Sequence, residues 1–148
     1  MSSATTPEKE LRAFIPGTLL PGFRHTVTGM IMRTRQWHGS NIVHSDPAMA
    51  ARQGLQNPPA TGQISASYIQ RMCVSYFGRA IFEGSVFDVR FRAPVFEGDT
   101  LTVGGEVLEV IRRPEMSRVV IEAWCRNDQG VDVTRARVEV NVPAAAPL

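Results

Sequence analysis

The C-terminal half of the chain alternates apolar and polar residues, the period of a strand with one buried face. Short turns separate the alternating runs, and the turn "NDQG" ends in a glycine typical of hairpins. The pattern therefore predicts consecutive antiparallel strands. The four runs are "SVFDVRFRAPV" (85–95), "DTLTVGGEVLEVI" (99–111), "SRVVIEAWCR" (117–126) and "VDVTRARVEVNV" (131–142).

The alternation is interrupted at two places. In the second run the apolar residues change face near Gly104 and Gly105, and in the fourth they change face between Val133 and Ala136. One extra residue in a strand produces such a change, so we expect a β-bulge or a strong twist at each place.

The N-terminal half predicts one more strand, over "RHTVTGMIMRTRQW" (24–37), after an extended lead-in, "FIPGTLLPGF" (14–23). Asp46 before Pro47 has the form of an N-cap followed by proline at the first helical position, so a short helix is expected up to Gly54. A proline-containing loop leads to "QISASYIQRMCVSYFGR" (63–79), whose apolar residues recur at helical spacing.

These elements predict an α+β fold in which an antiparallel sheet packs on one long helix. We expect a single domain over 1–148, with loose tails at about 1–10 and 143–148. One helix cannot readily cover five long strands, so an edge-to-edge or face-sharing dimer is expected.

The composition is typical of a soluble globular protein, and it argues against some classes of binding partner. Hydrophobic residues make up 43% and charged residues 20% of the 148 positions, with a net charge of +2. Without a basic run we expect no nucleic-acid partner, and without an 18-residue apolar stretch no membrane span. The histidines lack metal-ligand spacing, and Cys73 and Cys125 lack a disulfide pattern. No metal and a cytoplasmic location are therefore expected.

Four segments resemble the MaoC-like hydratases and dehydratases of acyl thioesters, which have the hot-dog fold. "NIVHSDPAMAARQG" is similar to their N-x-x-H-x-D-x-x-x-A signature. "PPATG" resembles the loop before their central helix. "RFRAPVFEGDTLTVGGEV" and "NDQGVDVTRARVEVNV" resemble their middle strands and last hairpin. The helix "YIQRMCVSYFG" also resembles that of small subunits of steroid-degrading hydratases.

The resemblance implies a hot-dog sheet wrapped around one long central helix, and an (R)-specific enoyl-CoA hydratase or 3-hydroxyacyl-CoA dehydratase of fatty acid or steroid metabolism. It makes His44 the acid and base, the Gly62 N–H an oxyanion donor and Asn41 an accessory group. Coenzyme A enters only as part of the acyl-CoA substrate, and no other cofactor is implied. The chain would form a homodimer or pair with another hot-dog chain. The residues implied to contact substrate are Ser40, Pro59, Ala60 and Thr61.

The acid that the family places five residues before this histidine is absent. Counting back from His44 reaches Gly39, or Ser40 if one residue is deleted, and neither carries a carboxylate. Three interpretations stay open. His38 replaces the acid as a base, since imidazole titrates near neutrality. Asp46 contributes, although its position suits N-capping. Or the chain is a non-catalytic or half-catalytic acyl-CoA-binding subunit.

A hot-dog thioesterase is a further alternative. Such enzymes resemble this chain in fold but commonly carry a carboxylate on the central helix. Residues 63–79 contain no Asp or Glu. The sequence therefore favours hydration over thioester hydrolysis, while the acyl group stays undetermined.

Overall fold

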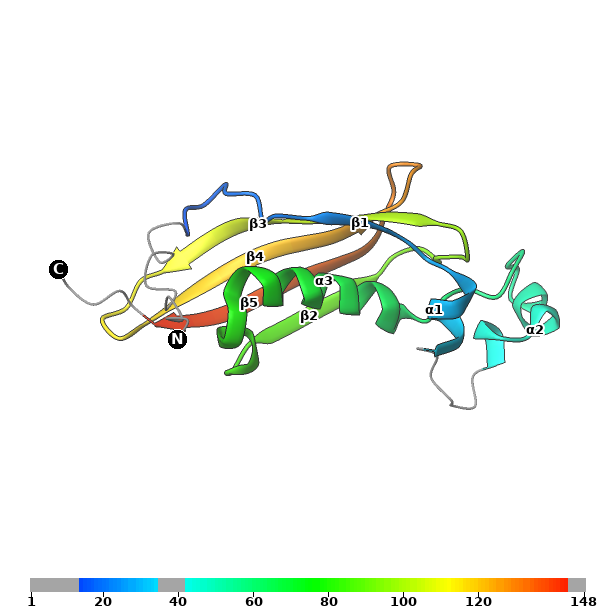
Figure 1. Ribbon diagram of the computed structural model, residues 1–148, viewed down its shortest axis with the longest axis horizontal. Coiled ribbons are helices and arrows are strands. Elements are labelled where there is room, and N and C mark those ends of the chain that lie inside the picture. The colour runs from blue at the N-terminus through cyan, green and yellow to red at the C-terminus, as the bar shows by residue number, and fades with distance from the viewer. Residues whose placement is uncertain (1–13, 35–41, 144–148) are drawn as a thin grey trace, which may run out of the picture.

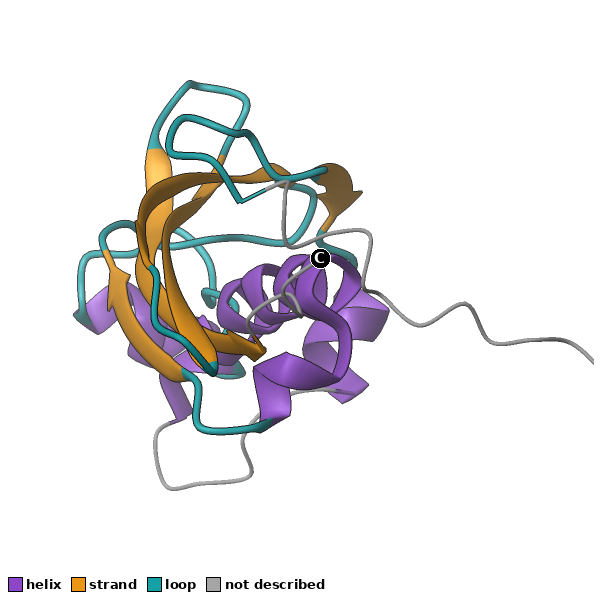
Figure 2. Cartoon of the chain, turned by 90° about the vertical axis from the view of Figure 1, so that its left-hand side faces the viewer, coloured by secondary structure: helices purple, strands orange, loops and turns teal. Residues whose placement is uncertain are grey.

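The computed structural model describes residues 14–34 and 42–143. Five strands form one antiparallel sheet in the order β1-β3-β4-β5-β2. The sheet curves around the long helix α3, which lies along its concave face, while α1 and α2 gather at one end of the molecule (Figures 1 and 2). The elements are β1 (Phe23–Thr26), α1 (Gly29–Thr34), η2 (Ile42–His44), α2 (Pro47–Arg52), α3 (Gly62–Phe77), η3 (Gly78–Phe82), β2 (Val86–Phe91), β3 (Thr100–Ile111), β4 (Met116–Arg126) and β5 (Asp132–Pro143).

The predicted α+β arrangement, a sheet wrapped around one long helix, is confirmed. The helix begins one residue earlier than expected and ends at Phe77, where Gly78 takes φ +60° and the chain continues as the 3₁₀ turn η3. A left-handed φ suits glycine because it has no Cβ. Residues 14–22 of the predicted lead-in form no helix or strand, and Phe23 already begins β1. The lead-in runs beside β3: the Leu20 N–H donates to Gly105 O over 2.8 Å.

The strand predicted over 24–37 is wrong beyond its first residues. Pairing of β1 with β3 stops at Thr26, and the described part of "GMIMRT" forms the helix α1. Thr28 begins that turn, because its Oγ1 accepts a hydrogen bond from the Ile31 N–H at 3.2 Å. Local capping therefore outweighed the β-branched composition, and residues 35–37 lie outside the described residues.

The bulge predicted at Gly104 and Gly105 lies elsewhere. The register of β3 against β4 shifts between Val107 and Glu109, which leaves Leu108 as the extra residue. The glycines serve packing instead. A Cβ on Gly104 would come within 2.8 Å of the Trp124 ring, and one on Gly105 within 2.9 Å of Met72 Cε.

The second predicted irregularity is confirmed near its expected place. Cys125 pairs with Thr134 and Arg126 with Asp132, so Val133 is the extra residue in β5. Val133 and Thr134 are consequently both buried, which breaks the alternation of the strand. This bulge brings the Thr134 hydroxyl toward the first turns of α3, where Ser65 meets it.

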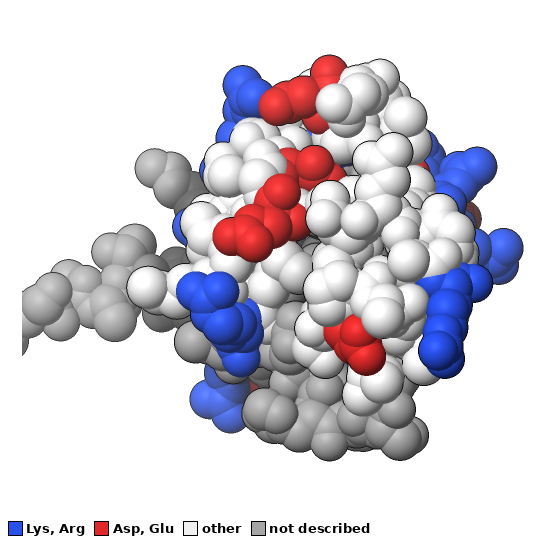
Figure 3. Space-filling model, turned by 90° about the vertical axis from the view of Figure 1, so that its right-hand side faces the viewer, with Lys and Arg blue, Asp and Glu red and all other residues white. Residues whose placement is uncertain are grey.

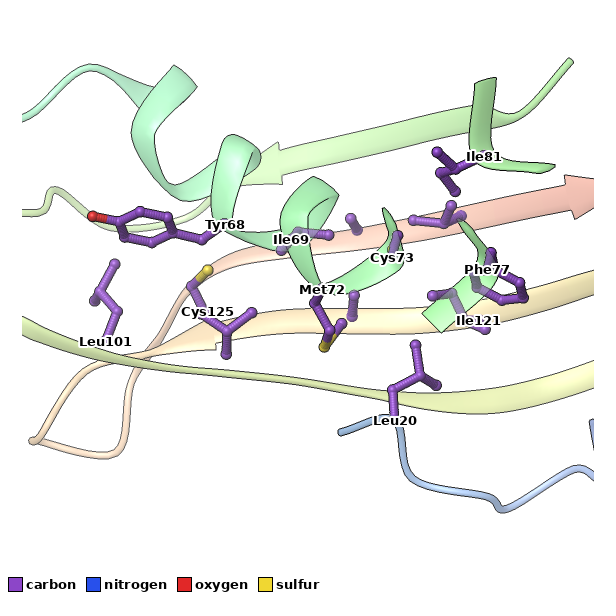
Figure 4. Close-up of a cluster of buried hydrophobic side chains, with 14 of the residues drawn as sticks. Leu20, Tyr68, Ile69, Met72, Cys73, Phe77, Ile81, Leu101, Ile121 and Cys125 are labelled. Atoms are coloured by element: carbon purple, nitrogen blue, oxygen red, sulfur yellow. The ribbon is translucent and has the colours of Figure 1, made fainter. Parts of the chain in front are cut away.

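The core lies between α3 and the sheet (Figure 4). Ile64, Ile69 and Met72 of the helix are at most 1% exposed and pack on buried strand residues such as Leu101 and Ile121. Tyr68 of the same helix is 7% exposed and belongs to this core. No helix in the described ranges is long and apolar enough to cross a membrane. Most of the predicted tails lie outside the described residues, although Pro143 still ends β5.

Candidate active site

His44 is held in place by the short turn η2 and the loop before α3. Its half-buried ring lies with Nδ1 2.9 Å from the Pro59 carbonyl oxygen. A carbonyl oxygen only accepts hydrogen bonds, so Nδ1 is the donor and a neutral ring carries its lone pair on Nε2. This arrangement orients Nε2 as the basic atom of the ring.

Asp46 has a structural role directly after this histidine. Its carboxylate accepts hydrogen bonds from the Ala48 and Met49 N–H groups at 2.8 and 3.4 Å, which is N-capping of α2 with Pro47 as the first helical residue. The prediction that Asp46 caps this helix is confirmed. The cap fixes the chain two residues after His44 and so limits movement of the turn that carries it.

The N-terminus of α3 faces the same region. Gly62 is the first residue of this 16-residue helix, and no acidic side chain lies in its first turn. The N-cap residue Thr61 makes no side-chain capping bond. The positive end of the helix dipole and the first backbone N–H groups therefore remain suited to an anionic or partially negative oxygen.

Close packing leaves no room for a side chain at Gly62 unless its neighbour moves. A Cβ at this position would lie 2.7 Å from Cε1 and Cζ of Phe91, well inside van der Waals contact. Phe91 ends the edge strand β2, and 57% of the residue is exposed. The exposed ring therefore covers the position that a side chain at residue 62 would occupy.

Two hollows meet at His44. The helix hollow, of about 520 Å³, includes His44, Gly62 and Phe91, and the loop hollow, of about 610 Å³, includes His44, Arg33 and Glu97. Both volumes lie in the range of small-molecule sites. The other residues of the helix hollow are Pro59, Ala60, Thr61, Gln63, Ile64, Ser65, Arg92, Ala93, Pro94, Val95 and Thr134. Those of the loop hollow are Gly29, Met32, Ser45, Asn57, Pro58 and Phe96.

Hydroxyl groups supply the buried polar part of the helix hollow. Ser65 and Thr134 are 3% and 1% exposed, and their hydroxyl oxygens lie 2.7 Å apart. Ser65 Oγ also donates to the Gly62 carbonyl oxygen over 3.2 Å. Thr61 is 5% exposed, and its Oγ1 has no hydrogen-bond partner in the described part of the chain. The hollow therefore combines an apolar lining with hydroxyls beside the helix N-terminus.

The surface around these hollows carries few charges. Seen from the end that holds α1 and α2, it is mostly uncharged, with acidic side chains among the uncharged ones and basic side chains toward the margins (Figure 3). Within the described ranges, no three His, Cys, Asp or Glu side chains group as potential metal ligands.

The structure brings together five of the residues singled out by sequence: His44, Pro59, Ala60, Thr61 and Gly62 all line the helix hollow. His38, Ser40 and Asn41 lie outside the described residues. Sequence reasoning missed Phe91, Ser65, Thr134 and Glu97. Thr134 lies at the irregularity that the change of face in the fourth run predicted, but no feature of the sequence pairs it with Ser65 or brings Glu97 to the hollow of His44.

An antiparallel five-stranded sheet wrapped around one long helix is the hot-dog fold, and here His44 and the N-terminus of that helix line the same hollow. The model of the MaoC-like domain matches residues 38–124, and the chain belongs to this family. Comparison with curated proteins gave no match.

Solved structures of other proteins share this fold. A MaoC-like dehydratase from Rhodospirillum rubrum is 25% identical with a TM-score of 0.73, and the alignment covers 93% of this chain and 98% of that one. The ChsH1-ChsH2 complex from Mycobacterium tuberculosis is 21% identical (TM-score 0.68; 86% and 98% covered). An (R)-hydratase from A. caviae involved in PHA biosynthesis is 20% identical (TM-score 0.67; 87% and 97% covered).

Proposed function

We propose that this chain adds water to a 2-enoyl-CoA thioester, or removes it from a 3-hydroxyacyl-CoA. The observation that carries the proposal is the shared hollow of His44 and the N-terminus of α3 at Gly62. Membership of the MaoC-like family supports the same reaction class. The reaction needs acid–base groups and an oxyanion site, and coenzyme A enters as part of the substrate.

In the proposed reaction His44 Nε2 takes a proton from water while the oxygen of that water bonds to the β-carbon of the enoyl group. Electrons move toward the thioester oxygen, where the Gly62 N–H and the helix dipole stabilise the negative charge. The imidazolium then returns its proton to the α-carbon. General acid–base catalysis of this kind contributes about 10²–10⁴ in rate, and one oxyanion donor about 10²–10³.

The hydrogen bond to Pro59 suits this role of His44. Because Nδ1 donates to the carbonyl, the ring keeps one tautomer, and the positive charge that it gains is stabilised by the same oxygen. Pro59, Ala60 and Thr61 are proposed to contact the acyl thioester as walls of the hollow, together with Ser40. Asn41 is proposed to hold the attacking water or brace His44.

The missing carboxylate has two proposed replacements within the chain. His38 lies outside the described residues and stays a candidate from sequence alone. Glu97 lines the loop hollow together with His44 and is exposed to solvent, so its side chain is the second candidate for taking the proton from water. Replacing each separately by glutamine identifies the one that acts.

A second candidate function is that of a half-catalytic subunit paired with another hot-dog chain. Two observations favour it: Gly39 and Ser40 occupy the position of the usual acid, and one of the similar structures is the ChsH1-ChsH2 complex. In this case the partner chain supplies the carboxylate. Thioester hydrolysis is disfavoured, because α3 as observed, Gly62–Phe77, contains no acidic residue.

The test is a hydration assay of the purified chain on short, medium and steroid-like enoyl-CoA substrates. His44→Asn keeps an N–H donor at the Nδ1 position for the Pro59 carbonyl but removes the base, so we expect kcat to fall at least about 100-fold. His25→Asn is the matched control, since this half-buried histidine packs on Tyr68 and lines neither hollow. Equal loss in both variants would count against a role of His44 in the reaction.

The same assay separates the two candidate functions. Turnover by the chain alone favours the complete enzyme. Binding of acyl-CoA without turnover favours the half-catalytic subunit, and the next step is to purify the chain with its natural partners.

A further inference from the structure

Thr61 combines burial with an unused hydrogen-bonding group. It is the N-cap of α3 and is 5% exposed, yet its hydroxyl caps no backbone N–H. Among the described residues Oγ1 has no partner at all. Threonine at an N-cap ordinarily accepts a hydrogen bond from the second or third helical residue. A buried hydroxyl without a partner lowers stability, so its presence at a hollow points to a ligand that completes it.

The other hydroxyls of the helix hollow are already engaged. Ser65 donates to the Gly62 carbonyl, so the bond it shares with Thr134 takes the hydrogen of Thr134. Both hydrogens are then used within the protein. Thr61 alone among these three hydroxyls keeps a hydrogen for another acceptor.

The backbone of Thr61 is fixed from both sides. The Ala60 N–H donates to the Val95 carbonyl over 2.7 Å, and the Ile64 N–H donates to the Thr61 carbonyl over 3.1 Å. Rotation about the Thr61 side chain alone is therefore enough to turn the hydroxyl toward an acceptor in the hollow. Its position next to Gly62 in the chain places it beside the first N–H of the helix.

We propose that the Thr61 hydroxyl is a second oxyanion donor, which binds the same thioester oxygen as the Gly62 N–H. The inference rests on the proposed function, because it assumes an acyl thioester in the helix hollow. The half-exposed Phe91 ring, which covers Gly62, has to move when the thioester docks there. A buried donor on a fixed backbone stabilises developing charge with little reorganisation of water.

The experiment compares Thr61→Val, Thr61→Ala and Thr61→Ser with wild type, in the full chain. Valine has the shape of threonine without the hydroxyl. We expect Thr61→Val to lower kcat on crotonyl-CoA by about 10²-fold with little change in KM, and Thr61→Ser to restore most of it. Removal of an unpartnered hydroxyl leaves Tm unchanged or higher. Thr134→Val provides the contrast, because it breaks a made hydrogen bond and lowers Tm.

A purely structural role gives a different pattern. Wild-type kcat in Thr61→Val overturns the proposal, and so does a fall in kcat that merely follows a fall in Tm. Thr61→Ala carries the same test if the valine variant does not fold.

The proposed function is tested separately, by measuring turnover and butyryl-CoA binding of the wild-type chain. If wild type binds butyryl-CoA but turns over no substrate, the complete-enzyme form of the proposed function fails. The inference is then decided by binding: a Kd at least fivefold weaker in Thr61→Val, restored by serine, supports it, and an unchanged Kd overturns it. Absence of butyryl-CoA binding by wild type overturns both.

Discussion

Replacement of Gly62 by alanine tests whether the Phe91 ring is a movable cover of the helix N-terminus. The new Cβ would lie 2.7 Å from two ring atoms, and ordinary contact begins at 3.4 Å, so the ring has to retreat by several tenths of an ångström. The obstacle is the far end of a side chain that is 57% exposed, at the end of an edge strand. Such a ring can turn toward solvent without moving the backbone.

The expected change in stability follows from two opposing terms. Full burial of a phenylalanine contributes about 1.5–3 kcal/mol, and less than half of Phe91 is covered, so losing that contact costs at most about 1 kcal/mol. Alanine in place of glycine gains up to about 1 kcal/mol in helix formation. The free energy of unfolding of Gly62→Ala should therefore lie within about 1 kcal/mol of wild type, while hydration activity falls at least about 10-fold because the methyl group and the displaced ring crowd the oxyanion position.

The assay is urea unfolding of wild type, Gly62→Ala, Phe91→Ala and the double variant, with hydration rates measured on the same samples. In the Phe91→Ala background the clash is gone, so Gly62→Ala should become neutral or stabilising, and the cycle should show a coupling of about 0.5–1 kcal/mol. A loss above about 3 kcal/mol in the single variant, or identical effects of Gly62→Ala in both backgrounds, would refute the movable-cover argument.

Further predictions concern the surroundings of the site. Asp46→Ala removes the cap of α2 and should lower the free energy of unfolding by about 1 kcal/mol in a urea titration; Asp46→Asn, which keeps an acceptor, should lose much less, and equal losses would contradict the capping role. Gly104→Ala forces a Cβ against the half-buried Trp124 ring and should lower the free energy of unfolding by about 1–3 kcal/mol, more than Gly62→Ala does. A larger loss in Gly62→Ala than in Gly104→Ala, measured in the same titration, would contradict this packing argument. Burial raises the pKa of the Cys73 and Cys125 thiols from 9.0 to about 12, in Cys125 with a smaller contribution from a nearby carboxylate. The folded chain should thus react with a thiol reagent at pH 8 far more slowly than the urea-unfolded chain. Because the folded pKa values are the higher ones, the associated stability is present below pH 9 and declines between pH 9 and 12, which thermal unfolding at stepped pH measures.

The local pattern determined which elements form. Alternation over the C-terminal half and helical spacing from 63 to 79 required no tertiary information, because each reflects the period at which one face of an element is buried. The short capped helix after Asp46 was equally local. The strand predicted over 24–37 failed for a local reason as well: capping by Thr28 competed with β propensity, and composition alone does not rank the two.

The candidate site also contains residues that the sequence identified and residues that only the structure placed there. The amino-acid sequence identified His44 and the Gly62 loop, since a short motif carries them, and it also showed that the usual acid is missing. Only the tertiary structure placed Phe91 over Gly62, joined Ser65 to Thr134 and brought Glu97 to the hollow of His44. These contacts join residues about 30 to 70 positions apart. A break in the alternation can indicate a bulge, as it did near Thr134, but no local period records which distant residue the bulged strand meets.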